Sequence, residues 1–152
     1  MNISLKVNGV AAEVDVPPHW TLLRMLRDML LHHEVKHGCG EGVCGACTVL
    51  LDGVAVNGCL VLAVQADGAD VRTVASLAEG DALHPLQREL VERGAVQCGF
   101  CTAGVVLGAL EATTIGAAGS REEIRRSLAG NLCRCTGYAT IVDAVEAYQL
   151  TR

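Results

Sequence analysis

Eight cysteines fall into two groups of four in this 152-residue chain, and no other feature constrains its fold as strongly. The first group reads C-x4-C-x2-C-x11-C and the second reads C-x2-C-x31-C-x-C. The members are Cys39, Cys44, Cys47 and Cys59, then Cys98, Cys101, Cys133 and Cys135. Because every cysteine belongs to one of the groups, the pattern predicts two four-thiolate metal sites.

The first spacing is typical of plant-type [2Fe–2S] ferredoxins. Three thiolates must reach a compact, negatively charged cluster from one loop, so the backbone turns sharply and its N–H groups can point at the sulfurs. The glycines that suit these turns are Gly38, Gly40, Gly42 and Gly45. Cys44 and Cys47 alone would fit a zinc knuckle equally well. The triplet among alternating glycines favours iron and sulfide, with Cys59 closing the site from beyond the next hairpin.

The second group is ambiguous by its spacing alone. Two close cysteine pairs, brought together by a helical hairpin, can hold zinc tetrahedrally as well as an iron–sulfur cluster. Cys133 and Cys135 are one residue apart, so they can bind one centre only where the backbone is not helical, and Asn131 and Gly137 suit such a loop. The first group favours iron here too, because an electron carrier gains from a second relay site. We expect a second cluster, with zinc as the alternative.

The first half of the chain has the strand–strand–helix–loop–strands order of a β-grasp, ferredoxin-like domain. Apolar and polar residues alternate from residue 3 to 7, and Asn8-Gly9 predicts a tight type I′ turn into a return strand. Thr21 can cap a helix with a leucine-rich buried side. The expected elements are a strand at 3–7, a return strand to 16, a helix at 21–32, and strands at 48–51, 54–56 and 70–74. We expect this domain to comprise residues 1–76.

The second half of the chain has helical character. Ser120 and Glu123 form a capping box, and Gly104 and Gly108 lie one turn apart on a predicted helix, where they let another backbone approach closely. The expected helices are 85–92, 102–114, 121–128 and 140–150. Their short links predict a small four-helix bundle domain at residues 77–152. The fold class is therefore expected to be α+β.

Composition narrows the partners and the compartment. The formal net charge is −5 and no run of Lys or Arg stands out, which argues against nucleic acid or an anionic membrane surface as a partner. No stretch of about 18 apolar residues predicts a membrane span, and the N-terminus lacks a signal-peptide pattern. We therefore expect a reducing, cytoplasmic environment, where clustered cysteines more often bind metal than form disulfides. The mean hydropathy of +0.35 predicts a well-filled core or an apolar face for a partner.

Three motifs carry a resemblance to a known family. Residues 38–49 read GCGEGVCGACTV, residues 97–102 read QCGFCT and residues 130–138 read GNLCRCTGY. Their content and order resemble the cluster signatures of the iron–sulfur subunit of the molybdenum hydroxylases, the family of xanthine dehydrogenase, aldehyde oxidase and carbon monoxide dehydrogenase. The resemblance covers essentially the whole chain. It departs at Ala103, where the family usually has Pro, and this affects only local rigidity at a helix start.

The resemblance implies a β-grasp domain and a four-helix domain with one [2Fe–2S] cluster each. It implies a complex with a large molybdopterin subunit and a medium FAD subunit, as a heterotrimer or its dimer. In the family the large subunit hydroxylates a substrate carbon with oxygen from water, and the reducing equivalents leave through the small subunit. The second cluster then lies next to the molybdenum cofactor and the first faces the flavin. Gln97 and Cys135 match positions that contact the pterin.

The chain is thus expected to be the electron-transfer part of an oxidoreductase complex, with no catalytic side chain of its own. It would pass single electrons from the molybdopterin centre through two clusters to FAD or another acceptor. Two alternatives stay open. A free-standing two-cluster ferredoxin should have a polar surface all round and run as a well-behaved monomer. A zinc-binding interaction module without a redox role would lack iron and sulfide. The substrate cannot be predicted, because it binds in the large subunit.

Overall fold

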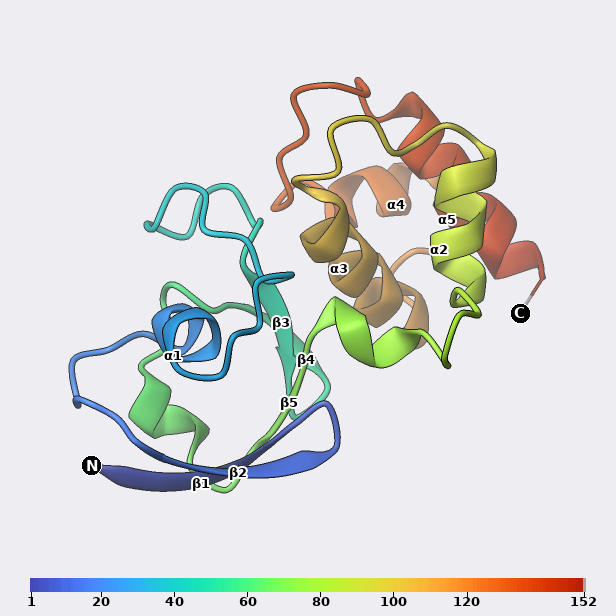
Figure 1. Cartoon of the computed structure of the whole chain (residues 1–152). Coiled ribbons are helices and arrows are strands. Elements are labelled where there is room, and N and C mark those ends of the chain that lie inside the picture. The colour runs from blue at the N-terminus through green and yellow to red at the C-terminus, as the bar shows by residue number, and fades with distance from the viewer. Residues whose placement is uncertain (152) are drawn as a thin grey trace.

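The computed structural model describes residues 1–151, and Arg152, the last residue of the predicted second domain, lies outside them. In this part of the chain, five strands and one α-helix precede residue 73 and four further α-helices follow it. The strands form a mixed sheet at one end of the molecule and the later helices gather at the other (Figure 1). The α+β class is thus confirmed. Among the described residues, no helix is long and apolar enough to cross a bilayer.

The first two strands form an antiparallel hairpin, as predicted. They are β1 (Asn2–Val7) and β2 (Val10–Asp15). Asn8 and Gly9 have φ values of 52° and 81°, which both central residues of a type I′ turn require. Burial along β1 alternates strictly from residue to residue, so its apolar side chains enter the core and its polar ones face outward.

The middle of the sheet is occupied by β5 (Asp70–Arg72), in the order β2-β1-β5-β3-β4. It runs parallel to β1 and antiparallel to β3 (Thr48–Leu51), which pairs with β4 (Val54–Asn57) in the second predicted hairpin. The predicted strand at 70–74 is too long, because the hydroxyl of Thr73 caps a 3₁₀ turn and the chain leaves the sheet there. The two 3₁₀ turns of this half are η1 (Ala63–Ala66) and η2 (Val74–Leu77).

The first α-helix, α1 (Leu22–Asp28), is shorter than the predicted helix at 21–32. Thr21 caps its start as expected, since its hydroxyl oxygen accepts a hydrogen bond from the N–H of Arg24 at 3.2 Å. The helix ends early because the chain turns at Leu31, which has a positive φ of 60°. The apolar side of α1 packs with the sheet and η1 in the first of two cores, which is built almost entirely from aliphatic side chains.

The later helices enclose a second core. They are α2 (Pro85–Glu92), α3 (Thr102–Thr114), α4 (Arg121–Ser127) and α5 (Ala139–Leu150). Ser120 caps α4 as predicted, with its hydroxyl oxygen accepting from the N–H of Glu123 at 3.3 Å. The bounds of α3 match the predicted helix at 102–114. The last helix, α5, begins at Ala139, one residue before the predicted start at 140, and follows Tyr138 in a left-handed conformation.

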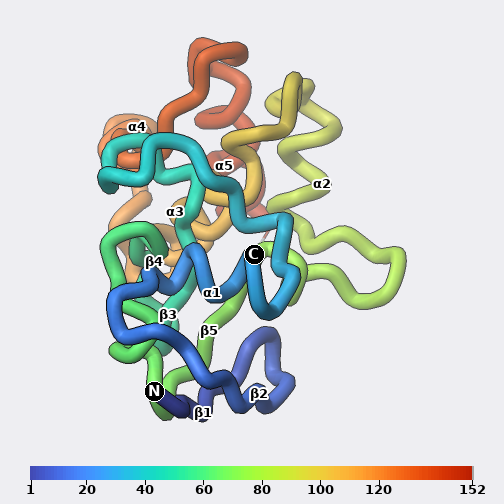
Figure 2. Tube along the Cα trace, turned by 60° about the vertical axis from the view of Figure 1, so that its left-hand side comes forward, coloured from blue at the N-terminus to red at the C-terminus, as the bar shows by residue number. Residues whose placement is uncertain are grey.

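The two halves meet where α3 packs on β3 and β4 (Figures 1 and 2). The contact is close because two helix positions lack side chains, as predicted. A Cβ at Gly104 would lie 2.2 Å from the carbonyl oxygen of Gly45, and one at Gly108 would lie 2.8 Å from the side-chain oxygen of Asn131. Further along α3, the carboxylate of Glu111 accepts a hydrogen bond from a backbone N–H of the edge strand β4 at 3.0 Å. The junction therefore brings α3 against the first cysteine loop.

Candidate metal centres

The first cysteine group lies in the loop between α1 and β3, and its last member follows β4. Positive φ values occur at Gly40 (74°), Gly42 (80°) and Gly45 (67°). These turns direct several N–H groups at the sulfur of Cys39. The donors, at 3.3 to 3.5 Å, are the backbone N–H groups of Glu41, Val43 and Cys44. The bonds, led by that of Glu41, lower the pKa of the Cys39 thiol to about 6, which favours the metal-binding thiolate.

The four thiols of this group are arranged as two pairs. Cys39 and Cys44 are hydrogen-bonded through their side chains, and the sulfur of Cys44 also accepts from the N–H of Cys39 at 3.4 Å. Cys47 and Cys59 are both buried and hydrogen-bonded to each other. Burial, with a further contribution from the Cys59 thiol, raises the pKa of Cys47 to about 11. A bound cation offsets this cost, because a coordinating thiol is deprotonated outright.

The second group is also arranged as two pairs. Cys98 and Cys101 lie in the turn before α3, and Cys133 and Cys135 lie in a non-helical loop before α5, as their spacing requires. The side chain of Cys101 is hydrogen-bonded to that of Cys133, and Cys98 to Cys135. Burial, then the neighbouring Cys133, raises the pKa of Cys101 to about 12. The hydrogen bond with Cys98 raises the pKa of Cys135.

Two hydroxyl groups hold the loop around Cys133. The Tyr138 hydroxyl accepts from the N–H of Cys133 at 2.7 Å and donates to the carbonyl of Asn131 at 3.1 Å. The Thr136 hydroxyl donates to the sulfur of Cys133 at 3.1 Å. Burial raises the pKa of Cys133, but hydrogen bonds led by the Thr136 hydroxyl outweigh it and lower the pKa to about 7. Sequence reasoning missed both roles, and the only signal was that both residues lie within the third motif.

The pairwise arrangement fits a two-iron cluster at each group, because each iron of a [2Fe–2S] cluster takes two protein ligands. A structural zinc site would instead bring four ligands around one ion. The donor set, the pairing and the N–H groups at the sulfurs therefore match a two-iron centre.

The two groups are joined directly at the junction of the halves. The N–H of Leu132 donates to the carbonyl of Cys44 at 2.9 Å, which connects the residue before Cys133 to a cysteine of the first group. The buried side chain of Asn131 donates to the carbonyl of Gly45 at 3.0 Å and to a β3 hydroxyl at 3.1 Å. One short segment of the second half thus contacts the first cysteine loop twice.

Exposed apolar side chains surround both cysteine groups. Four of them are sequence neighbours of cysteines: Val43, Leu60, Phe100 and Leu132, with exposed fractions of 57%, 63%, 47% and 50%. Gln97 and Cys135, which the resemblance associates with the pterin, are also exposed, and Gln97 directly precedes Cys98. The exposed surface around the cysteines therefore includes apolar side chains.

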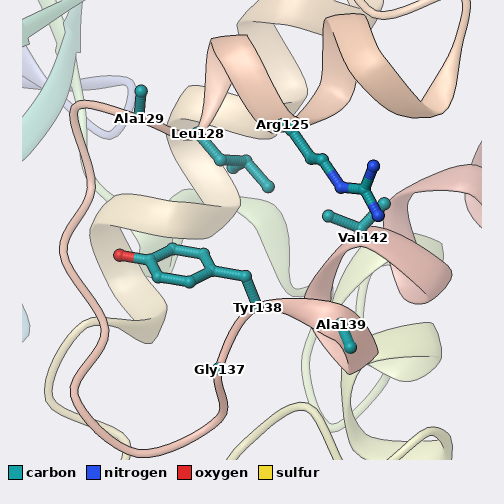
Figure 3. A pocket seen from close by; sticks show the side chains of 7 residues that line it. All are labelled: Arg125, Leu128, Ala129, Gly137, Tyr138, Ala139 and Val142. Atoms are coloured by element: carbon teal, nitrogen blue, oxygen red, sulfur yellow. The ribbon is translucent and has the colours of Figure 1, made fainter.

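A cavity of about 430 Å³ lies between α4 and the start of α5 (Figure 3). Its lining includes Arg125, Tyr138 and Val142, and no cysteine among the described residues. The Tyr138 ring forms one wall, and its hydroxyl points toward the neighbouring loop (Figure 3). The cavity thus borders Tyr138, the residue that holds the Cys133 loop.

Two family models match the chain and define its class. The 2Fe-2S iron-sulfur cluster binding domain matches residues 5–78, and the [2Fe-2S] binding domain matches residues 73–146. The chain is therefore a protein with two [2Fe–2S]-binding domains, and the predicted [2Fe–2S] cofactors are confirmed.

Similar proteins identify the family. The nicotine 6-hydroxylase small subunit of Paenarthrobacter nicotinovorans is 48% identical over 145 residues, which cover 95% of this chain and 87% of that protein. The xanthine dehydrogenase iron-sulfur-binding subunit of Escherichia coli O157:H7 is 46% identical over 151 residues, covering 95% and 92%. The crystal structure of quinoline 2-oxidoreductase from Pseudomonas putida 86 matches 99% of this chain and 94% of that chain, with a TM-score of 0.95 and 43% identity. The chain belongs to the family of small iron–sulfur subunits of the molybdenum hydroxylases.

Proposed function

We propose that this chain is the electron-transfer subunit of a molybdenum-dependent hydroxylase or dehydrogenase. It passes single electrons from the molybdopterin centre of a large subunit to FAD or another acceptor. The observation that carries this proposal is that two groups of paired thiols lie on either side of one junction and are linked by the hydrogen bond from Leu132 to Cys44. The relatives are named for nicotine, xanthine and quinoline. Since their substrates differ while these subunits are similar, the substrate is selected outside this chain.

We assign all eight cysteines as ligands, in the pairs that the structure forms. The pairs are Cys39 with Cys44, Cys47 with Cys59, Cys98 with Cys135, and Cys101 with Cys133. A bound [2Fe–2S] cluster accepts and releases one electron at a time, at roughly −400 mV in plant-type ferredoxins. The chain's own residues adjust this chemistry, because N–H and O–H groups stabilise negative charge on the sulfurs and burial of Cys47 and Cys59 excludes water from one side.

Few bonds separate a cysteine of the second group from a cysteine of the first. From Cys133 one peptide link leads to Leu132, whose N–H is bonded to the carbonyl of Cys44. Asn131 fixes this contact by donating to Gly45 in the same loop. A single hydrogen bond therefore completes an otherwise covalent path between a ligand of one cluster and a ligand of the other.

We place the second group next to the molybdopterin subunit and the first group toward the FAD subunit. Exposed Gln97 and Cys135 are available to contact the pterin. The exposed apolar residues beside the cysteines, Val43 and Leu60 in the first group and Phe100 and Leu132 in the second, suit burial against partner subunits. The same residues count against a free-standing ferredoxin, whose surface would be polar all round.

The proposed assembly is a heterotrimer of small, medium and large subunits, or its dimer, in the cytoplasm. Within this subunit we propose a β-grasp domain at residues 1–76 and a four-helix bundle domain at 77–152. The mixed sheet packed by α1 supports the first, and the common core of α2 to α5 supports the second. The overlap of the two family matches at 73–78 is compatible with a boundary there.

The test is a reciprocal pair of serine substitutions in the assembled complex. Cys135→Ser should remove the second cluster's electron paramagnetic resonance (EPR) signal, leave the first, and stop turnover with the natural acceptor. Cys59→Ser is the matched control and should remove the first signal instead. Intact turnover in Cys135→Ser would contradict the relay order. Zinc in place of iron would contradict the electron-transfer function itself, and a stable monomer that never binds the partner subunits would favour a free ferredoxin.

A further inference from the structure

We infer that the hydroxyl of Thr136 sets the reduction potential of the second cluster by donating a hydrogen bond to the sulfur of Cys133. The inference rests on the proposed ligation of that cluster by Cys133. It gives Thr136 a positioning and tuning role, because the residue acts through a ligand and does not itself bind iron.

The direction of the Thr136 hydrogen bond is determined by its neighbours. A threonine hydroxyl has one hydrogen to donate. The oxygen of Thr136 accepts from the N–H of Tyr138 at 3.2 Å, and the oxygen lies 3.1 Å from the sulfur of Cys133. An N–H group has no lone pair to accept the hydroxyl hydrogen, so this hydrogen is directed at the sulfur.

The loop geometry keeps this hydroxyl in place. The side chain of Tyr138 returns to the same loop, where its own hydroxyl bridges the carbonyl of Asn131 and the N–H of Cys133. Tyr138 reaches this position with a positive φ of 70°, a conformation that is uncommon outside glycine. Hydrogen bonds among Cys133, Thr136 and Tyr138 therefore close a small ring, which holds the Thr136 hydroxyl beside the sulfur of Cys133.

A hydrogen-bond donor at the sulfur of Cys133 raises the reduction potential of the second cluster. Reduction adds one negative charge that the cluster shares with its thiolates, and a hydrogen bond stabilises the more negative state. In the first group the donors to the sulfur of Cys39 are backbone N–H groups, which truncating a side chain does not remove. At Cys133 the donor is a side chain, so its contribution can be removed alone.

The magnitude follows from ordinary hydrogen-bond energies. The hydrogen bond is present in both redox states and is stronger in the reduced one, so its loss should change the one-electron reduction equilibrium by up to about tenfold. A tenfold change for a one-electron couple is about 59 mV. Loss of the hydroxyl should therefore make the second cluster harder to reduce by up to about this amount.

The experiment is a redox titration of the assembled complex, followed by the EPR signal of each cluster. Thr136→Val keeps the branched shape and should lower the midpoint potential of the second cluster, while that of the first stays unchanged. Thr136→Ser restores a hydroxyl and should restore the potential. Thr140→Val is the matched control, because the Thr140 hydroxyl is buried and has no hydrogen-bond partner among residues 1–151, so its removal should shift neither potential.

Iron and sulfide content is measured first, because a chain without two clusters refutes the proposed function and not only this inference. With both clusters present, an unchanged potential in Thr136→Val refutes the inference alone. An equal shift in Thr140→Val would also refute it, since the effect would not depend on the donor. If Thr136→Val loses the second cluster, Thr136→Ala removes the same hydroxyl with less bulk. Loss in both would assign Thr136 to cluster retention and contradict the tuning role.

Discussion

Replacing Gly104 by alanine tests the close junction between the two halves. The added methyl group would lie 2.2 Å from the carbonyl oxygen of Gly45 and 2.9 Å from the side-chain nitrogen of Asn131. Alanine favours a helix interior over glycine by about 1 kcal/mol. Overpacking costs about 1 to 3 kcal/mol, and the upper value applies because no rotamer change moves a backbone oxygen. The free energy of unfolding should therefore fall by about 2 kcal/mol, which lowers Tm by roughly 4 to 8 °C in a chain of this size.

Thermal unfolding of the cluster-loaded chain measures this loss, followed by circular dichroism and by the visible absorbance of the clusters. Gly130→Ala is the matched control at the same junction, because a methyl group there would meet no atom within 4 Å. Its Tm should stay close to that of the unmodified chain. If Gly104→Ala left Tm unchanged or raised it, α3 would not approach the first cysteine loop as closely as described.

Two further substitutions probe contacts that hold the centres in place. Glu111→Ala removes the hydrogen-bond acceptor of the Ala55 N–H in edge strand β4, now bonded at 3.0 Å, and should lower the free energy of unfolding in urea by about 1 to 2 kcal/mol. Glu111→Gln keeps an acceptor and should lower it less. Equal losses in the two variants would assign the effect to the charge of Glu111. Tyr138→Phe removes the hydroxyl that joins Asn131 to Cys133, so an iron chelator should strip the second cluster faster than in the unmodified chain. An unchanged rate, read from the EPR signal, would show that this clamp does not retain the cluster.

Local rules made much of the fold predictable. The turn at Asn8-Gly9 and the cap at Thr21 depend on neighbouring residues alone, and both occur as expected. The length of α1 did not follow, because apolar spacing continues past its end, whereas the chain leaves the helix and folds back along it. The guanidinium of Arg27 donates to the carbonyl of Val35 at 2.6 Å, and the chain turns back at Leu31.

For the metal centres too, the features set by local sequence were predictable and those set by the fold were not. Grouping the cysteines needed only their spacing, since ligands of one cluster must reach it from a few loops. Their pairing was not predictable, because it depends on where β4 delivers Cys59 and how the loop before α5 presents Cys133. The bond from Leu132 to Cys44 and the donor at Thr136 also escaped prediction. One joins distant segments, and the other requires the path of an irregular loop.

Metal and sulfide analysis of the purified complex, combined with EPR of its reduced form, tests the central claim most directly. Two clusters predict about four iron and about four acid-labile sulfide per small subunit, with two distinguishable signals. Zinc at either cysteine group, or a single signal with half the iron, would contradict the account of this chain as a two-centre electron carrier.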